Sequence, residues 1–399
     1  MRRISGFRHL IFLCDSVFDL VRLAFFSVFD RIALLGVRPV APETPVTLVV
    51  RLDAIGDYLM FRPFLEPLVE HERRNGRRVR LCGNRVWREL AESFDGSLID
   101  DFIWLDRGKF VRSPSYRWRK LRELNAIGYE QVISPTFSRD LFFADWVGGS
   151  VRARRKVACT GDPGTVGGWR KWLGDMTYTE LLPVENRVLF EIERNRQFCQ
   201  SLLGQAVATP ARLLPEGGDV EHYGLPAAYA VLFVSASSKY RKWPLDRFRQ
   251  VGSWLADECG LDVVVCGGPE DMAEVARDQV FSRDSRFHNL VGATTLLELI
   301  AIVGQARILV SNETMAPHCA ALPNRTPCIV IYNGNNFGRA LPYPEEICDR
   351  HFPVYHPAIA ADPEAYKAES NRFGFYNTLD ICDISTEMVI EQIKRAQPL

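Results

Sequence analysis

Residues 46–63 read VTLVVRLDAIGDYLMFRP. Residues 46–52 of this stretch form a short apolar run rich in β-branched side chains, which is typical of a buried strand. Gly56 then permits a tight turn, and the apolar residues that follow have helical spacing. A strand that leads through a glycine turn into a helix is the repeating unit of a parallel sheet with helices on its faces.

The same alternation continues on both sides of one interruption. Further strands are predicted over 77–83, 102–106 and 129–136, and then over 229–237, 261–268, 288–292, 306–313 and 326–334. The interruption, 206–224, contains Pro210, Pro215 and adjacent glycines, which indicate a linker. The sequence therefore predicts an α/β protein with two doubly wound domains, 45–205 and 225–399, that face each other across a cleft.

The first forty residues differ from the rest. Residues 4–37 are rich in Phe, Leu, Ile and Val, and the charges at positions 8, 15, 19, 22 and 30 share one stripe of a helix. No stretch of about 18 uncharged apolar residues is present, so a spanning helix is not expected. We expect an amphipathic helical extension over 1–40 that lies in a membrane interface or packs on the protein or a partner chain. A signal peptide is a third interpretation, but no small-residue cleavage site follows.

Composition narrows the function classes. The 399 residues carry 49 basic and 49 acidic side chains, and 47% of them are apolar, which excludes a disordered chain and argues against a dedicated nucleic-acid binder. The first 200 residues hold 32 basic and 25 acidic side chains, which allows this half to face an anionic partner. Ten cysteines occur without a CxxC pair, which favours free buried thiols in a reducing compartment.

Candidate chemistry lies in the loops that follow strands, because ligands of doubly wound sheets bind beyond the carboxyl ends of the strands. In the first loop, Asp57 stands at the start of a helix directly after Gly56. Its carboxylate either acts as a general base or caps the helix. Asp53 is the second candidate for the base.

The second loop, VSASSKYRKWP over 234–244, combines a small-residue turn that includes Ser237 with two cations, Arg241 and Lys242. Cations and backbone amides at a helix start favour the binding of a diphosphate. The alternative is a solvated basic turn whose Trp243 packs in the core.

Two further loops complete the candidate site. Over 264–276, Gly267 permits close approach of a ligand and Glu270 offers a carboxylate to a base or ribose, but an ordinary strand-to-helix turn explains this loop equally well. The last loop, NETMAPHCAA over 312–321, places Asn312, Glu313 and Thr314 before a helix that carries His318. This set suits a phosphate or a sugar hydroxyl, although a single histidine on a helix is more often structural.

Together the four loops resemble the heptosyltransferase-like glycosyltransferases of family 9, which have the two-domain GT-B fold with two Rossmann-like domains. The family's R-x-x-x-x-G-D signature matches Arg51 to Asp57, with Pro63 beyond it. Its K-R-W-P loop, its glycine turn and its N-D-T-G-P-M-H motif match 234–244, 267–270 and 312–321. The resemblance covers residues 45–345 and keeps the order and spacing of the motifs.

The resemblance implies an inverting transfer of heptose or a related sugar from a nucleotide-diphosphate donor similar to ADP-heptose to a cell-envelope glycolipid or glycan, as in lipopolysaccharide biosynthesis. It implies Asp57 as the general base, with Arg51 and Gly56 on the acceptor-side domain 45–205. The donor contacts implied on the nucleotide-sugar-binding domain 225–399 are Ser237, Arg241, Lys242, Gly267, Glu270, Asn312, Glu313, Thr314 and His318.

The same reasoning predicts the partners. No cofactor and no metal ion are expected, because no DxD motif occurs in a suitable loop and cationic side chains can stabilise the departing diphosphate. No nucleic-acid partner is expected. The protein is expected in the cytoplasm, peripheral on the inner face of the cytoplasmic membrane if residues 1–40 bind lipid.

Two departures from the family pattern keep alternatives open. Glu313 stands where the family has Asp, and Met315-Ala316 stand where it has Gly-Pro, which restricts how closely the backbone approaches a ligand. One alternative is a catalytically degenerate protein that binds a sugar nucleotide or scaffolds a membrane complex. Another is a nucleotide-dependent oxidoreductase or epimerase, which would ordinarily show a glycine fingerprint after the first strand.

Overall fold

The structure, a computed structural model, describes residues 2–162, 167–208, 214–215, 217–335, 337–372 and 375–396, with the backbone alone for 2–17 and 282. Two compact units make up the chain. Unit 1 comprises Met1–Leu52, Val69–Arg85 and Ile99–Leu182, and unit 2 comprises Asp53–Leu68, Val86–Leu98 and Pro183–Leu399. The predicted linker, 206–224, includes residues 209–213 and 216, which lie outside the described residues.

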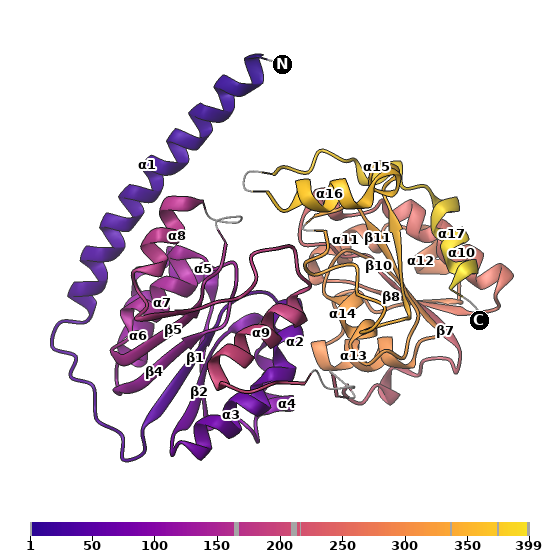
Figure 1. The fold of residues 1–399 in the computed structure, drawn as a ribbon. Helices are drawn as coiled ribbons and strands as arrows, with labels where there is room; N and C mark the ends of the chain where they lie inside the picture. Colours follow the sequence, from indigo (N-terminus) through magenta and orange to yellow (C-terminus); the bar gives the residue numbers. More distant parts are fainter. Residues whose placement is uncertain are drawn as a thin grey trace. The chain divides into compact units, whose positions relative to one another are not determined.

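Unit 1 is built on a parallel six-stranded sheet in the order β3-β2-β1-β4-β5-β6. Figure 1 labels four of these strands, β1, β2, β4 and β5. Its strands are β1 (Val46–Arg51), β2 (Arg78–Asn84), β3 (Asp101–Leu105), β4 (Tyr129–Ser134), β5 (Ala153–Cys159) and β6 (Glu180–Leu182). Every residue of β1 is buried, as its apolar run predicts. The last two strands were not predicted, because β5 begins with consecutive cations that break the apolar pattern and β6 has only three residues.

Unit 2 contains a second parallel six-stranded sheet, in the order β12-β11-β10-β7-β8-β9. Its strands are β7 (Tyr229–Phe233), β8 (Asp262–Cys266), β9 (Phe287–Asn289), β10 (Ile308–Asn312), β11 (Cys328–Tyr332) and β12 (His351–Tyr355). Five of them were predicted. The missed strand, β12, contains Pro353 and lies at the edge of the sheet, where a residue without an N–H group is tolerated.

Both sheets have the same doubly wound order, with the reversal between β1 and β4 in one and between β7 and β10 in the other. The predicted fold class, an α/β protein with two Rossmann-like sheets, is confirmed. The helices of unit 1 outside α1 and α3 are α5 (Arg107–Arg112), α6 (Pro114–Leu124), α7 (Trp146–Ser150) and α8 (Gly168–Asp175). α3 (Leu65–Arg74) begins in unit 2 and ends in unit 1.

The helices of unit 2 come from three parts of the chain. Two precede most of the unit in sequence, α2 (Ile55–Phe61) and α4 (Arg88–Asp95), and α9 (Glu191–Leu203) packs against α2. The others are α10 (Leu245–Glu258), α11 (Met272–Val275), α12 (Gln279–Arg283), α13 (Leu296–Gln305), α14 (Ala316–Ala321), α15 (Pro357–Ala361), α16 (Pro363–Ser370) and α17 (Thr386–Arg395). The core of the unit gathers apolar side chains of β7, β8, β10 and β11 around Trp243, which is fully buried.

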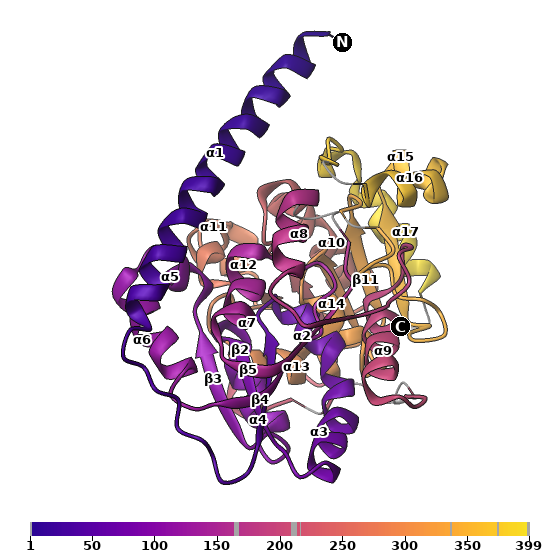
Figure 2. The same cartoon turned by 60° about the vertical axis from the view of Figure 1, so that its left-hand side comes forward.

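The N-terminal extension is one helix, α1 (Arg2–Ala33), of 32 residues. Its second half lies along unit 1, and its first half extends beyond the other helices of that unit (Figures 1 and 2). Among the described residues, no helix is both long and apolar enough to cross a membrane. The helical extension predicted over 1–40 is present as α1, which ends at Ala33.

The charged side of α1 faces unit 1. Arg117 of α6, itself buried, donates two hydrogen bonds of 2.6 and 2.5 Å to the carboxylate of Asp30. Nearer the middle of the helix, Arg170 pairs with Asp19, and the guanidinium of Arg22 lies over the ring of Phe142. The predicted stripe of charges thus points inward along the described part of the helix, and the side chains of Arg8 and Asp15 lie outside the described residues.

The apolar side of α1 is exposed. Five side chains spaced alternately three and four residues apart are between 49% and 74% exposed: Phe18, Val21, Phe25, Val28 and Ile32. Residues with this spacing lie along one face of a helix. Other apolar side chains of the helix, Phe26 and Ala33, are buried against unit 1. A surface helix ordinarily turns its apolar face to the core and its charges to water, so this exposed apolar row is an additional face that unit 1 does not cover.

Candidate functional site

Hydrogen bonds join the end of β10 to the loop that follows β7, at the point where the strand order of the second sheet reverses. The side-chain amide of Asn312 donates to the backbone carbonyls of Val234 (2.9 Å) and Ser235 (3.2 Å), and its Oδ1 accepts the backbone N–H of Trp243 (3.0 Å). Asn312 is fully buried. Because the protein satisfies both N–H groups of this amide, Asn312 sets the shape of the loop over 234–244.

Arg241 occupies the centre of this loop. Its Nη2 donates to Ser237 Oγ (2.5 Å), its Nε donates to Ser238 Oγ (3.1 Å), and its Nη1 lies 3.6 Å from Oε1 of Glu313. The structure therefore brings together three of the predicted donor residues, Ser237, Arg241 and Glu313, from two loops. A planar guanidinium held in this way matches the geometry of phosphate oxygens.

Glu313 is only 7% exposed, and its Oε2 has no hydrogen-bond partner among the described residues. Burial raises the pKa of this carboxyl to about 8, although the charge of Arg241 acts in the opposite direction. A buried polar atom without a partner is costly, and a bound hydroxyl would supply one. Thr314, the next residue, is half-buried.

Lys242 has a different role from its neighbour. Its Nζ donates to Asp271 Oδ1 (2.5 Å) and to Glu274 Oε2 (2.6 Å). Burial acts to lower the pKa of Lys242, but these two carboxylates outweigh it and raise the pKa. Asp271 is buried and also accepts a hydrogen bond from the Ser235 hydroxyl. In this structure Lys242 joins the loop over 234–244 to the turn after β8.

That turn contains Gly267 and Glu270. A Cβ on Gly267 would lie 3.1 Å from Ser235 Oγ and 3.2 Å from a methyl group of Val234, so a larger residue would crowd the loop after β7. Glu270 is exposed, and its carboxylate lies over Gly268, where it would clash with a Cβ. Gly267 therefore lies against the loop after β7, and Glu270 is an exposed acid in the same turn.

Asp57 is the third residue of α2, and its Oδ2 accepts the backbone N–H of Ala54 (3.1 Å). The helix-capping alternative is therefore present in the structure. It does not exclude a second role, because an ionised carboxylate can accept several hydrogen bonds. The side chain of Asp57 is half-buried, and the first turn of a helix favours a negative charge.

The rest of α2 is held firmly. The ring of Tyr58 stacks on Trp87 with their centroids 4.2 Å apart, and its hydroxyl donates to the buried carboxylate of Asp95. Arg62 pairs with the same carboxylate at 2.9 Å. From α9, the amide of Asn195 donates to the carbonyl of Met60 (3.2 Å). These contacts fix the helix that carries Asp57.

His318 connects α2 to the loop after β11. A Cβ on Gly56 would stand 2.6 Å from Cδ2 and 2.7 Å from Nε2 of the His318 ring, so glycine is required there while the ring keeps its place. On the other side, His318 Nδ1 is 2.7 Å from the hydroxyl of Tyr343. Burial lowers the pKa of His318 to about 4, so the imidazole is neutral near pH 7.

The remaining predicted residues of the first loop, Arg51 and Asp53, precede α2 in the chain. Arg51 ends β1 in unit 1 and is fully buried. Asp53 is half-buried in unit 2, and its backbone carbonyl accepts the indole N–H of Trp87 (3.2 Å). In unit 2, therefore, the helix that carries Asp57 and the loops that carry Arg241, Glu313 and His318 belong to one compact body.

Three residues that shape this site were not predicted. Tyr343 holds His318, and Ser235 with Asp271 hold the glycine turn and Lys242. Asp271 stands directly after the predicted Glu270, and Ser235 belongs to the small-residue loop, so both lay inside quoted motifs. Tyr343 is 25 residues from its partner, and no local pattern in its segment indicates the contact.

Comparison with known proteins identifies part of the chain. Residues 191–349 match the family model described as Glycosyltransferase family 9 (heptosyltransferase). This part of the chain is a glycosyltransferase family 9 domain. It contains every predicted donor residue, from Ser237 to His318, and also Tyr343. The resemblance seen in the sequence is confirmed, and so is the predicted enzyme class, a glycosyltransferase.

Solved structures agree with this glycosyltransferase fold. A glycosyl transferase family 9 protein from Veillonella parvula is 17% identical, with a TM-score of 0.65. The match covers 99% of its chain and 90% of this one. The Escherichia coli heptosyltransferase WaaC with ADP is also 17% identical, with a TM-score of 0.61 and coverage of 100% of its chain and 88% of this one. The E. coli ADP-heptose lps heptosyltransferase II is 14% identical, with a TM-score of 0.54. The match covers 98% of its chain and 88% of this one. No curated protein sequence matches.

Proposed function

We propose that this glycosyltransferase moves heptose or a related sugar, with inversion, from a nucleotide-diphosphate donor to a hydroxyl group of a cell-envelope glycolipid or glycan. The observation that carries the proposal is that unit 2 holds Arg241 against Glu313, and His318 against Gly56, the residue before Asp57, inside and next to the family 9 domain. A cation, a buried acid with an open oxygen and a half-buried carboxylate are the groups that a sugar-diphosphate donor and an attacking hydroxyl need.

In the proposed reaction Asp57 accepts the proton of the acceptor hydroxyl as that oxygen attacks the anomeric carbon of the donor. The bond from this carbon to the diphosphate oxygen breaks, and negative charge develops on the leaving diphosphate. Arg241, oriented by Ser237 and Ser238, stabilises that charge, so no metal ion is needed for this step. Neutral His318 accepts no proton from the reaction near pH 7; it positions α2 through Gly56.

The donor is proposed to be ADP-heptose or a close relative of it. Structures of WaaC contain ADP and an ADP-2-deoxy-2-fluoro heptose, and this chain has the same fold as WaaC. Oε2 of Glu313, which has no partner among the described residues, is proposed to form a hydrogen bond with a hydroxyl of the donor sugar. Glutamate in place of the family's aspartate reaches one methylene further, so the sugar is expected to lie slightly differently from a heptose in the relatives.

We further propose that the enzyme works at the inner face of the cytoplasmic membrane with α1 lying in the lipid interface. The support is the apolar stripe from Phe18 to Ile32, which unit 1 leaves exposed, and the absence from the described helices of one that could span a bilayer. A helix with this kind of apolar face lies in the plane of a membrane at the boundary between headgroups and acyl chains. A glycolipid acceptor is found at the same boundary.

The test is a binding and turnover experiment on the full chain. Nucleotide diphosphates and nucleotide sugars, ADP and ADP-heptose among them, are screened for thermal stabilisation, and transfer is then followed by mass spectrometry of a bacterial glycolipid extract. A donor at 100 times its dissociation constant should add about 2.7 kcal/mol to the free energy of unfolding. Binding without any transfer would favour the alternative of a catalytically degenerate binding protein. If no nucleotide diphosphate binds, the assignment of the donor site is contradicted.

A further inference from the structure

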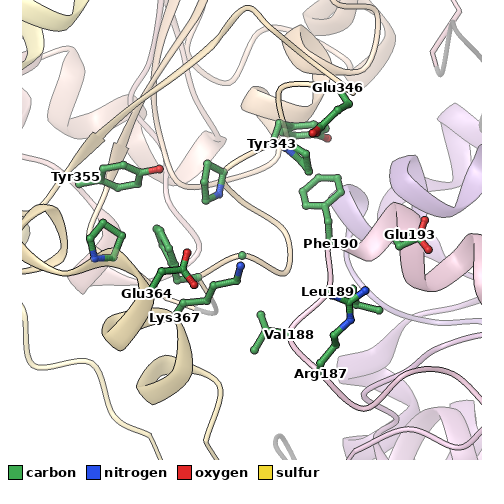
Figure 3. A pocket seen from close by; sticks show the side chains of 15 residues that line it. Arg187, Val188, Leu189, Phe190, Glu193, Tyr343, Glu346, Tyr355, Glu364 and Lys367 are labelled. Atoms are coloured by element: carbon green, nitrogen blue, oxygen red, sulfur yellow. The ribbon is translucent and has the colours of Figure 1, made fainter.

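A cavity in unit 2 lies beyond the site described above. It has a volume of about 830 Å³ and is formed by the segment before α9, the loop after β11, the end of β12 and α16 (Figure 3). All of its lining residues belong to unit 2. This volume falls within the range of roughly 300–1,000 Å³ that is usual for small-molecule sites.

Aromatic rings form two walls of the cavity. Phe190 and Tyr343 meet edge to face with their centroids 4.8 Å apart, and Phe337 and Tyr355 do so at 5.5 Å. Phe190, Phe337 and Tyr343 are buried, so their positions are fixed by packing. The exposed parts of these rings, above all of the half-buried Tyr355, offer apolar carbon to the C–H faces of a pyranose ring, which have no charge and little polarity.

Four polar side chains at the cavity have no protein partner among the described residues. Among the described residues, no hydrogen-bond or ion-pair partner is found for the carboxylates of Glu346 and Glu364, the ammonium of Lys367 or the hydroxyl of Tyr355. Figure 3 shows Glu364 and Lys367 reaching from α16 toward a space whose other side is formed by Phe190 and Tyr343. Two acceptors, one donor and one group that does both match the hydroxyls of a sugar, each of which donates one hydrogen bond and accepts others.

The charges at the rim argue against an anionic ligand. The other cation there, Arg187, is already paired with Glu185, and a third acid, Glu193, is engaged by Arg196. A phosphate or polyanion would therefore meet one free cation and two free carboxylates. Like charges brought close together cost free energy, so the rim favours a neutral, hydroxyl-rich molecule.

The cavity is connected to the catalytic region by one side chain. Tyr343 forms part of its wall, and the hydroxyl of Tyr343 holds His318, whose ring in turn lies against Gly56 beside Asp57. A molecule that packs on the Tyr343 ring would therefore touch the residue that fixes the position of His318.

From this geometry we infer that the cavity is a saccharide-binding subsite, which takes a sugar residue of the acceptor glycan remote from the hydroxyl that reacts. The part of the inference that names the acceptor rests on the proposed function; the part that names a saccharide rests on the rings and the unpaired polar groups alone. Sugar binding on the Tyr343 wall stabilises the position of the His318 ring that is compatible only with glycine at position 56.

The experiment measures saccharide binding by the full chain in the absence of donor. Saturation-transfer difference NMR is recorded with maltose, cellobiose, lactose and melibiose, and ADP binding is measured by calorimetry on the same preparation. Glu364→Trp fills the cavity from its rim, and Glu391→Trp makes the same exchange on an exposed part of α17 outside the cavity. Lys367→Ala removes the free cation and leaves the cavity open.

We expect transfer to the ring protons of at least one disaccharide in the unchanged protein and in Glu391→Trp, with loss in Glu364→Trp. Lys367→Ala should weaken that binding at least fivefold, as expected for a hydrogen bond to a charged group. No binding of any of the four sugars, or equal binding by Glu364→Trp and the unchanged protein, overturns the inference. If the sugar binds but ADP does not, the proposed donor site is contradicted and the saccharide subsite is supported.

Discussion

The His318 ring lies so close to Gly56 that a Cβ at position 56 would stand 2.6 Å from its Cδ2. Real Cβ atoms do not approach other atoms this closely, so the imidazole and α2 determine each other's position. Asp57 is the next residue along the chain. The placement of the proposed base is therefore coupled to a buried imidazole of the family 9 domain, and through it to Tyr343.

Gly56→Ala should lower the transfer rate by at least about tenfold, because a displacement on the order of 1 Å near reacting groups can cost about a hundredfold. Donor affinity is measured alongside by calorimetry. Gly304→Ala is the matched control, since a Cβ there meets nothing within 4 Å and alanine favours a helix over glycine. Equal rates in the two variants would show that the contact has no bearing on catalysis.

Asp57→Asn should reduce the rate by about 10²–10⁴-fold, the range for loss of a general base. Asparagine can still accept the Ala54 N–H, so the helix cap is kept and the melting temperature should change little. Rate, donor affinity and melting temperature are determined on one preparation. Turnover close to normal would leave Asp57 as a cap and make Asp53 the next residue to test.

Arg241→Ala and Lys242→Ala should have different effects although the residues are adjacent. Arg241→Ala should weaken diphosphate binding by about 1.5–3 kcal/mol, as for a charge-assisted hydrogen bond, and leave nucleoside binding unchanged. Lys242→Ala leaves the buried Asp271 without its cation, so it should chiefly lower the melting temperature. Titration calorimetry and thermal melts separate the two outcomes. Arg241→Ala that keeps full affinity for diphosphate would contradict its assignment.

Glu313 should make the stability of the protein pH-dependent. Burial raises its folded-state pKa to about 8, above the ordinary value, so the folded protein holds the proton more strongly than the unfolded chain does. Its contribution to the free energy of unfolding is therefore favourable at low pH and is lost as pH rises toward 8. Glu313→Gln does not titrate. Urea denaturation at several pH values should show this variant gaining stability relative to the unchanged protein between about pH 5 and 8 and no further above that range.

A Glu391→Gln variant, in which an exposed carboxylate is exchanged, serves as the control for that series. A stability difference between Glu313→Gln and the unchanged protein that does not vary with pH would mean that Glu313 stays ionised throughout.

Val21→Ser combined with Val28→Ser should release the protein from lipid vesicles. Both valines are more than half exposed, and the loss of two apolar side chains from the lipid interface is worth roughly 3 kcal/mol. The control is Val40→Ser combined with Val86→Ser, two exposed valines outside α1. Co-sedimentation with vesicles gives the partition of each variant, and melting temperatures show that both fold. Equal partition of the two double variants would contradict lipid binding by the exposed face of α1 and favour a partner protein that covers this face.

Much of the fold follows from local patterns. The apolar runs that precede glycine turns predicted nine of the twelve strands, because a strand buried on both faces has a nearly continuous apolar sequence. The three misses depart from that pattern through consecutive cations in β5, a length of three residues in β6 and an internal proline in β12. The site loops were found because the carboxyl ends of neighbouring parallel strands meet at one edge.

The limits of sequence reasoning lie in contacts between distant segments. The pattern of α1 predicts a charged stripe and an apolar stripe, but it does not say which of them faces the protein. That choice depends on Arg117 and Arg170, which offer partners to Asp30 and Asp19 from other helices. In the same way, Arg241 and Lys242 form a basic pair in sequence, and their roles are separated by partners from distant segments, Asp271 and Glu274 for Lys242 and Glu313 for Arg241.

The inward charges of α1 have a consequence for how the protein would fractionate from cells. Salt removes peripheral proteins that are held by exposed basic residues, because mobile ions screen such attractions. Here Asp30 and Arg117 are buried against each other and are screened little, while the exposed surface that we propose to meet the bilayer is a row of phenylalanine, valine and isoleucine side chains. High-salt washing should therefore leave the enzyme in the membrane pellet, and a mild detergent should bring it into solution.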